Sequence, residues 1–220
     1  MLRRFQISVE GNVGVGKSCF IARLGADLEK LGKRVHIAPE PIEHWTNWEG
    51  KYNLLGMQYT TPKAFAMPFQ LAACISKCEQ LLDTPPRIEI LLTERSLDSQ
   101  LKVFLPALIK DNSITDLDVT ILHRLFTLEK RDARLRPDLF IYLRADPEVA
   151  LTRTCLRKRP EEEGVQLQLL QGLHEIHDKW LIDEQECLLV DATGLPDSLT
   201  VARENLQYYH QFMLFSGIGI

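Results

Sequence analysis

An eight-residue stretch near the start of the chain, residues 11–18, most strongly limits what the chain can fold into. It reads Gly-Asn-Val-Gly-Val-Gly-Lys-Ser, follows an apolar alternating run over 5–9 and precedes a helical pattern over 19–31. Strand, glycine-rich loop and helix in this order are the setting of a P-loop. Glycines permit positive φ and let backbone N–H groups surround phosphate oxygens, at which the following helix points its positive end.

The P-loop predicts a binding site for a nucleoside triphosphate. The residues expected to contact it are Gly11, Asn12, Val13, Gly14, Val15, Gly16, Lys17 and Ser18. We expect Lys17 to reach the β- and γ-phosphates and the Ser18 hydroxyl to bind Mg²⁺. The alternative is a glycine-rich turn that binds no ligand. The complete eight-residue match, with both flanks correct, argues against that alternative.

Length and composition narrow the class further. The 220 residues predict a single domain, 1–220, and the net charge of −4 weighs against a nucleic-acid partner. No apolar run approaches the roughly 20 residues of a membrane span, and a strand that begins by residue 5 leaves no room for a signal peptide. Five cysteines without a C-x-x-C pair indicate a reducing, intracellular compartment. The cytoplasm is the first expectation, with mitochondria and nucleus left open, as is a precursor segment removed before residue 1.

Strand and helix patterns alternate along the rest of the chain, which is typical of an α/β fold. The further strands are expected at 34–38, 88–93, 139–143 and 187–190. Helices are expected at 63–82, 99–110, 116–135, 167–182 and 196–215, with one more opening at Asp146-Pro147-Glu148. The prediction is a five-stranded parallel sheet with helices on both faces. Ligands of such sheets lie beyond the carboxyl ends of the strands.

Charged residues stand at those ends. Glu40 follows the second strand between two prolines and could accept the proton of an attacking hydroxyl, or be a turn acid with no task. Glu94 and Arg95 follow the third strand, where P-loop enzymes commonly keep an acid on the Mg²⁺ side. A solvent-facing salt bridge is the alternative for this pair. Phosphoryl transfer needs such groups to position the acceptor and neutralise charge.

Three arginines, Arg153, Arg157 and Arg159, end a helix and lead into a glutamate-rich loop. Over about 153–164 they suit a mobile lid that closes on a triphosphate. The alternative is a solvated basic helix end. Aromatic side chains could form a slot for a base but are more often core.

Taken together, the motifs resemble the cellular deoxyribonucleoside kinase family. They are Glu-Gly-Asn-Val-Gly-Val-Gly-Lys-Ser from Glu10, Pro-Glu-Pro-Ile-Glu-His-Trp from Pro39, Ala-Met-Pro-Phe-Gln from Ala66, Glu-Arg-Ser from Glu94, Arg-Lys-Arg-Pro-Glu-Glu from Arg157 and Leu-His-Glu-Ile-His-Asp-Lys-Trp-Leu from Leu173. Their order and spacing cover nearly the whole chain. The resemblance implies a P-loop kinase fold with an arginine-rich lid, ATP with Mg²⁺, a small-molecule nucleoside acceptor and a homodimer.

The resemblance also implies residue roles. Glu40 matches the base for the 5′-hydroxyl, with Arg95 on the same oxygen. Gln70 matches the amide that pairs with the base edge. The walls around the base match Trp45, Phe69 and Phe104, the pair on the 3′-hydroxyl matches Tyr59 and Glu162, and the lid arginines match Arg153, Arg157 and Arg159. The loop around 191–197 lies where the family packs adenine.

Departures from the family pattern lie in the acceptor pocket. Gln100 stands where purine-accepting members have Asp, and Leu101-Lys102 replaces an Arg-Tyr pair. Lys77 falls where deoxycytidine-type members carry an arginine near the base, and Leu169 replaces a tyrosine. The absent Asp and the Ala-Met-Pro-Phe-Gln spelling favour pyrimidine deoxynucleosides, thymidine first. The shortness of the chain and its divergence from the family suggest a viral member. The rival interpretations are a nucleoside monophosphate kinase such as thymidylate kinase, and a kinase-fold subunit without activity.

Overall fold

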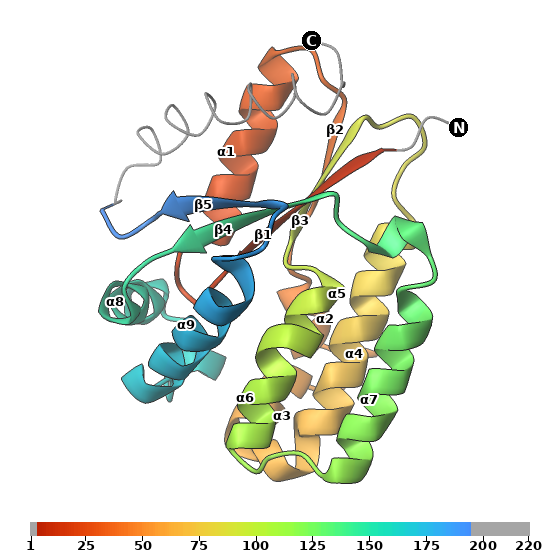
Figure 1. Ribbon diagram of the computed structural model, residues 1–220. Helices are drawn as coiled ribbons and strands as arrows, with labels where there is room; N and C mark the ends of the chain where they lie inside the picture. The colour runs from red at the N-terminus through yellow and green to blue at the C-terminus, as the bar shows by residue number, and fades with distance from the viewer. Residues whose placement is uncertain (1–3, 195–220) are drawn as a thin grey trace.

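The computed structural model describes residues 4–194 and contains a five-stranded sheet in the order β2-β3-β1-β4-β5, with every neighbouring pair parallel. The strands are β1 Phe5–Gly11, β2 Val35–Ala38, β3 Ile90–Glu94, β4 Leu139–Arg144 and β5 Cys187–Asp191. The sheet forms the middle layer of the molecule (Figure 1). This confirms the predicted five-stranded parallel sheet and α/β class.

Helices cover both faces of this sheet. The helical elements are α1 Lys17–Lys30, α2 Ile42–Thr46, α3 Leu54–Thr60, α4 Pro62–Leu82, α5 Leu97–Ser99, η1 Gln100–Phe104, α6 Leu105–Lys110, α7 Asp116–Glu129, η2 Ala133–Leu135, α8 Pro147–Arg157, η3 Pro160–Glu162 and α9 Leu167–Leu181. Helix α1 lies on one side, whereas α4, α6, α7 and α9 lie on the other (Figure 1).

Side chains of β3 point alternately to the two faces of the sheet and belong to two different hydrophobic clusters. Ile90 and Leu92 pack with Leu28 of α1, whereas Leu91 between them packs with Leu81 of α4 on the other face. All three β3 residues are fully buried. Because successive side chains of a strand point to opposite faces, a continuous apolar run is what a strand covered on both sides requires.

The structure differs from the expected helices in three places. Segment 39–61, where no helix was expected, holds the short helices α2 and α3. The helix expected over 116–135 ends at Glu129, because Asp132 accepts from the backbone N–H and guanidinium of Arg134 in a turn that a helix cannot contain. The helix expected from residue 99 begins at Leu97, capped by Ser96. The helix expected over 196–215 lies outside the described residues.

A wider turn interrupts the helix that runs from α5 into α6. Over Gln100–Phe104 the backbone is a π-helix, and the Leu105 N–H donates to the Gln100 carbonyl five residues back. Pro106 stands just beyond, at the start of α6. Proline has no N–H and its ring collides with the carbonyl four residues earlier, so a regular α-helix is disfavoured at this point. The wider turn lets the helix continue.

Candidate active site

The P-loop follows the carboxyl end of β1, and its glycines have the positive φ angles that the sequence led us to expect. Gly14 and Gly16 have φ of 78° and 103°. A Cβ at Gly14 would lie 2.3 Å from the carbonyl oxygen of Ala150 in α8, so the loop passes closer to this helix than any side chain allows. Gly16 immediately precedes α1. The loop therefore presents backbone N–H groups and a helix N-terminus to one anion site.

Lys17, at the first position of α1, is buried in this loop. Its Nζ donates to the Asn12 carbonyl at 3.0 Å and lies 3.9 Å from Oε1 of Glu94. Burial, and then the positive charge of Arg95, lower the pKa of Lys17 to about 8, while Glu94 opposes that shift. The ammonium is held at the loop by partners that a phosphate oxygen could replace.

The Ser18 hydroxyl and the Glu94 carboxylate, the two oxygen groups expected on the Mg²⁺ side, lie in contact with one another. The Ser18 hydroxyl donates to Oε2 of Glu94 at 2.9 Å. Magnesium prefers oxygen ligands, and one or two protein oxygens completed by phosphate and water are its usual site beside a triphosphate. The pair fits that chemistry. Within residues 4–194, no group of three or more His, Cys, Asp or Glu side chains is arranged to hold a metal ion.

Glu40 and Arg95, from the ends of two neighbouring strands, form an ion pair. Arg95 Nε donates to Oε1 of Glu40 at 3.1 Å, and its guanidinium lies 4.8 Å from the centre of the Phe104 ring. Burial acts to raise the pKa of Glu40, but the surrounding cations, led by Arg95 and Lys17, outweigh it and hold the pKa below a glutamate's ordinary value. Nη1 of Arg95 is buried without a partner among the described residues.

A cavity of about 560 Å³, open mouth included, joins this pair to the P-loop. Its lining residues are Val13, Gly14, Lys17, Glu40, Ile42, Trp45, Leu55, Tyr59, Phe69, Glu94, Arg95, Gln100, Phe104, Arg157, Arg159 and Glu162. Eight of the nine residues expected to bind the acceptor are among them. The mixture of aromatic walls and a few polar groups is typical of a small-molecule site.

Gln70 is the expected acceptor residue that does not line the cavity. It is 3% exposed, and its Oε1 finds no partner within residues 4–194. Gln100, which does line the cavity, also has an unpaired buried Oε1. The π-turn that begins at Gln100 and ends at Phe104 brings both side chains to the same cavity. These two amides, together with Nη1 of Arg95, are buried groups at this site that still need hydrogen-bond partners.

The lid segment contributes Arg157, Arg159 and Glu162 to the cavity lining. Glu162, 6% exposed, accepts from Arg159 at 2.7 Å and also from Arg157, while the neighbouring Glu161 accepts from Asn53 at 2.8 Å. Arg153 lies elsewhere and donates to the carbonyls of Val15 and Ala192, at 3.1 and 3.0 Å. Two of the three expected lid arginines thus face the cavity, and Arg153 connects α8 to the P-loop.

Tyr59 shares the cavity with the lid glutamate. Burial, followed by the negative charge of Glu162, raises the pKa of Tyr59 to about 12, so its hydroxyl remains protonated. It is available as a hydrogen-bond donor beside a carboxylate. A sugar hydroxyl, which both donates and accepts, suits such a pair.

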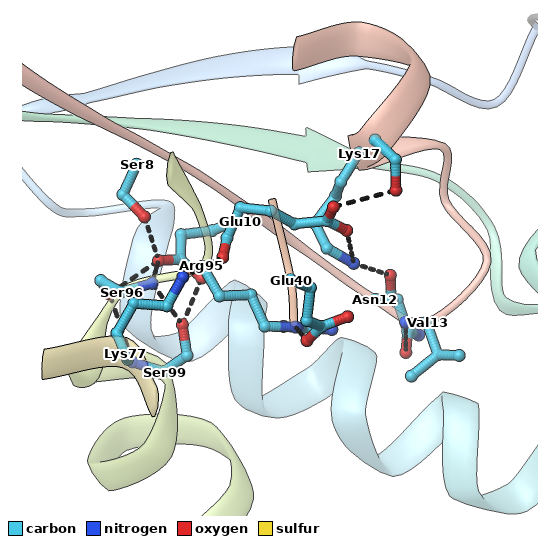
Figure 2. A network of polar contacts seen from close by, with 12 residues as sticks. Ser8, Glu10, Asn12, Val13, Lys17, Glu40, Lys77, Arg95, Ser96 and Ser99 are labelled. Atoms are coloured by element: carbon cyan, nitrogen blue, oxygen red, sulfur yellow. Dashed lines mark hydrogen bonds and ion pairs between the residues drawn. The ribbon is translucent and has the colours of Figure 1, made fainter. Parts of the chain in front are cut away.

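A buried carboxylate that the sequence analysis did not single out organises the turn after β3. Glu10 is fully buried and accepts from the Ser96 backbone N–H at 2.9 Å, and from the hydroxyls of Ser8, Ser96 and Ser99 at 2.8, 2.7 and 2.5 Å (Figure 2). A glutamate at the end of an apolar strand was the available signal, because a buried charge needs partners.

Comparison with known proteins agrees with this geometry. The sequence model of the family described as "Deoxynucleoside kinase" matches residues 7–208. The chain belongs to the deoxynucleoside kinase family. Deoxycytidine kinase of Homo sapiens is 30% identical over 199 residues, covering 80% of this chain and 75% of that protein. The mitochondrial deoxyguanosine kinase of Xenopus laevis is 30% identical over 198 residues, covering 80% and 72%. Thymidine kinase 2, mitochondrial, of Homo sapiens is 28% identical over 177 residues, covering 80% and 64%.

Membership makes the chain a phosphotransferase of P-loop kinase fold, as the motifs predicted. The similar proteins are named for deoxycytidine, deoxyguanosine and thymidine, so their names do not choose one base for this chain. All five cysteines are free thiols. Among the helices of residues 4–194, none combines the length and apolarity needed to cross a membrane.

Proposed function

We propose that the protein transfers the γ-phosphoryl group of ATP to the 5′-hydroxyl of a deoxyribonucleoside, with a pyrimidine base and thymidine as the first candidate. The observation that carries this proposal is the Glu40–Arg95 ion pair, which lies in one cavity with Lys17 of the P-loop. A carboxylate in this place suits an acceptor that must lose a proton. A phosphate acceptor, as in a nucleoside monophosphate kinase, would instead be repelled by it.

Glu40 accepts the proton of the 5′-hydroxyl as the oxygen attacks the γ-phosphorus. The low pKa keeps the carboxylate ionised at neutral pH. Arg95 holds that carboxylate through Nε and offers its unpaired Nη1 to the same acceptor oxygen. Lys17, Arg157 and Arg159 supply positive charge around the transferring group, which is the main requirement of phosphoryl transfer.

Ser18 and Glu94 would hold Mg²⁺, which, when bound, draws charge from the phosphate oxygens. Tyr59 and Glu162 orient the sugar through its 3′-hydroxyl. Since Glu162 also accepts from Arg157 and Arg159, sugar binding and lid position are linked through one carboxylate. Trp45, Phe69 and Phe104 enclose the base. The Trp45 and Phe69 rings lie 5.3 Å apart in an edge-to-face contact, which fixes these two walls relative to one another.

The amides favour a neutral base edge. Gln100 offers both a donor and an acceptor where an acid would offer acceptors only, so it suits a base whose edge carries both kinds of group. Thymine has such an edge, as do other bases. The order among the four deoxynucleosides is therefore the point to measure.

The test is a phosphorylation panel with ATP. The four deoxynucleosides are offered separately, with Mg²⁺ and with EDTA, and ADP release is followed together with the product mass. We expect Mg²⁺-dependent formation of a 5′-monophosphate, with the highest kcat/KM for a pyrimidine. No transfer to any deoxynucleoside would refute the function, and a purine preference would refute the assignment of the base.

We also propose a homodimer formed through α4 and α7, which lie side by side over the same core (Figure 1). These helices expose large aliphatic side chains, namely Ile75, Leu82, Leu117, Ile121 and Leu128. Exposed apolar side chains concentrated on neighbouring helices favour association. Sedimentation of the wild-type protein should give twice the mass of 25.2 kDa, and Ile121→Arg should shift it toward the monomer.

A further inference from the structure

Hydrogen bonds to neighbouring residues hold the backbone of the turn that carries Glu94 and Arg95. The Arg95 N–H donates to the Val9 carbonyl at 3.0 Å, and the Ser96 N–H donates to Glu10 at 2.9 Å. Arg95 has φ of 63°, a left-handed conformation that costs a non-glycine residue about 1 kcal/mol or more. Such a conformation persists only where the surroundings hold it.

The Glu94 carbonyl, which belongs to the peptide bond between Glu94 and Arg95, also needs a hydrogen-bond partner. Strand β2 has ended by then, because its last pair in the register is Ala38 with Thr93. The carbonyl accepts instead from Nζ of Lys77, on α4, at 2.9 Å (Figure 2). Lys77 is 4% exposed. The ammonium of Lys77 therefore replaces the backbone N–H that a longer β2 strand would donate to this carbonyl.

We propose that Lys77 is a positioning residue: its buried ammonium fixes the Glu94–Arg95 peptide and thereby sets where the magnesium-side carboxylate and the acceptor-side guanidinium point. This inference rests on the proposed function. It differs from a role at the nucleobase, because Nζ is already given to a backbone carbonyl and Lys77 does not line the cavity.

The electrostatic surroundings agree with a charged Lys77 in this place. Burial lowers its pKa to about 8, while Glu40, Glu10 and Glu94 act to raise it. Those three carboxylates surround the turn, and each has further partners of its own. A buried ammonium contributes little to stability even when paired, since its desolvation offsets the attraction. A role in positioning accounts for a buried lysine at this point of the core.

The test compares Lys77→Met, which keeps the volume and removes the charge, with Lys77→Arg and with Cys78→Ala as a control. Cys78 is the next residue of α4 and contacts Glu129 of α7, away from the turn. Hydrogen–deuterium exchange of the peptide that contains residues 94–96 is measured, together with kcat and the Mg²⁺ concentration that gives half-maximal rate.

In Lys77→Met we expect exchange at residues 94–96 to be about tenfold faster or more, kcat to fall about 10- to 100-fold, and more Mg²⁺ to be required. Lys77→Arg should recover part of each effect, and Cys78→Ala should leave all three near wild type. Unchanged exchange would overturn the inference, and so would faster exchange with wild-type kcat and Mg²⁺ response. If the wild-type protein phosphorylated no nucleoside, the proposed function would fail, whereas the exchange comparison would still decide whether Lys77 holds the turn.

Discussion

Replacing Glu40 by Gln tests the proposed chemistry at a single atom. The amide keeps an oxygen that can accept from Arg95 Nε, now at 3.1 Å from the carboxylate, so the arginine should stay in place. What the variant loses is the ability to take a proton. A positioned general base contributes about 10²–10⁴-fold. Because the cations around Glu40 lower its pKa and so its basicity, we expect the lower part of that range, about 10²–10³-fold in kcat.

That loss corresponds to about 3–4 kcal/mol in the activation barrier. The assay is steady-state kinetics with thymidine and ATP, accompanied by calorimetric titration of ATP. Glu43→Gln, an exposed change three residues later on α2, is the matched control. The affinity for ATP should remain near wild type in both variants. A kcat for Glu40→Gln within a factor of two of wild type would refute the role of Glu40.

The pH dependence adds a sign to the same prediction. A carboxylate whose pKa is lowered in the folded protein stays ionised above that pKa. Its charge, and with it its ability to act as a base, is lost as the pH falls through that value. The acid limb of kcat/KM should therefore lie below the ordinary range of a free glutamate and should be absent from Glu40→Gln. An acid limb at or above that range would contradict the lowered pKa.

Three further predictions concern the groups around this site. With a pKa of about 8, Lys17 should lose its charge as pH rises through that value, so ATP affinity should weaken from pH 7 to 9.5 in the wild type and stay flat, and lower, in Lys17→Met. Desolvation lowers the pKa of buried His177 to about 3, so the unfolded chain binds more protons than the folded protein between about pH 3 and 6.5. The free energy of unfolding should therefore fall by up to about 1.4 kcal/mol per pH unit as the pH is lowered through this range. Urea titrations should show a smaller fall in His177→Gln. Gly14→Ala should abolish ATP binding because its Cβ meets the backbone of α8, whereas Gly172→Ala, in open space on α9, should raise the unfolding free energy by about 0.5–1 kcal/mol.

The sequence predicted those parts of the fold that local patterns determine. The strands expected at 88–93 and 139–143 are largely apolar because both faces of the sheet are covered. The P-loop was recognisable because glycine is strongly favoured where φ is positive, as it is at Gly11, Gly14 and Gly16. Helices α2 and α3 were missed because each is short and takes its stability from packing around Trp45 and Leu55. Asn53, whose side chain accepts from the Gly56 N–H, was a capping signal that could have located α3.

Eight of the nine residues expected at the acceptor line one cavity, but the contacts among them could not be predicted. The sequence placed Glu40 and Arg95 at the carboxyl ends of two strands of one parallel sheet, and the strand order in the structure makes those two strands neighbours. Glu162 accepts from two arginines only five and three residues earlier, but the side-chain conformations of the lid segment decide that contact, and no sequence pattern gives them. The contact of Lys77 with a backbone carbonyl depends on how α4 packs against the turn after β3. The π-turn before Pro106 had a signal in the proline, but its consequence for Gln100 and Phe104 appears only in three dimensions.

The central claim is that the cavity accepts an alcohol beside Glu40 and not a phosphate. The most direct measurement offers thymidine and thymidylate in equal concentration, with ATP and Mg²⁺, and quantifies both products in the same reaction. We predict that thymidine 5′-monophosphate accumulates and that thymidine diphosphate does not form at a comparable rate. Diphosphate as the main product, with thymidine left unchanged, would contradict the account.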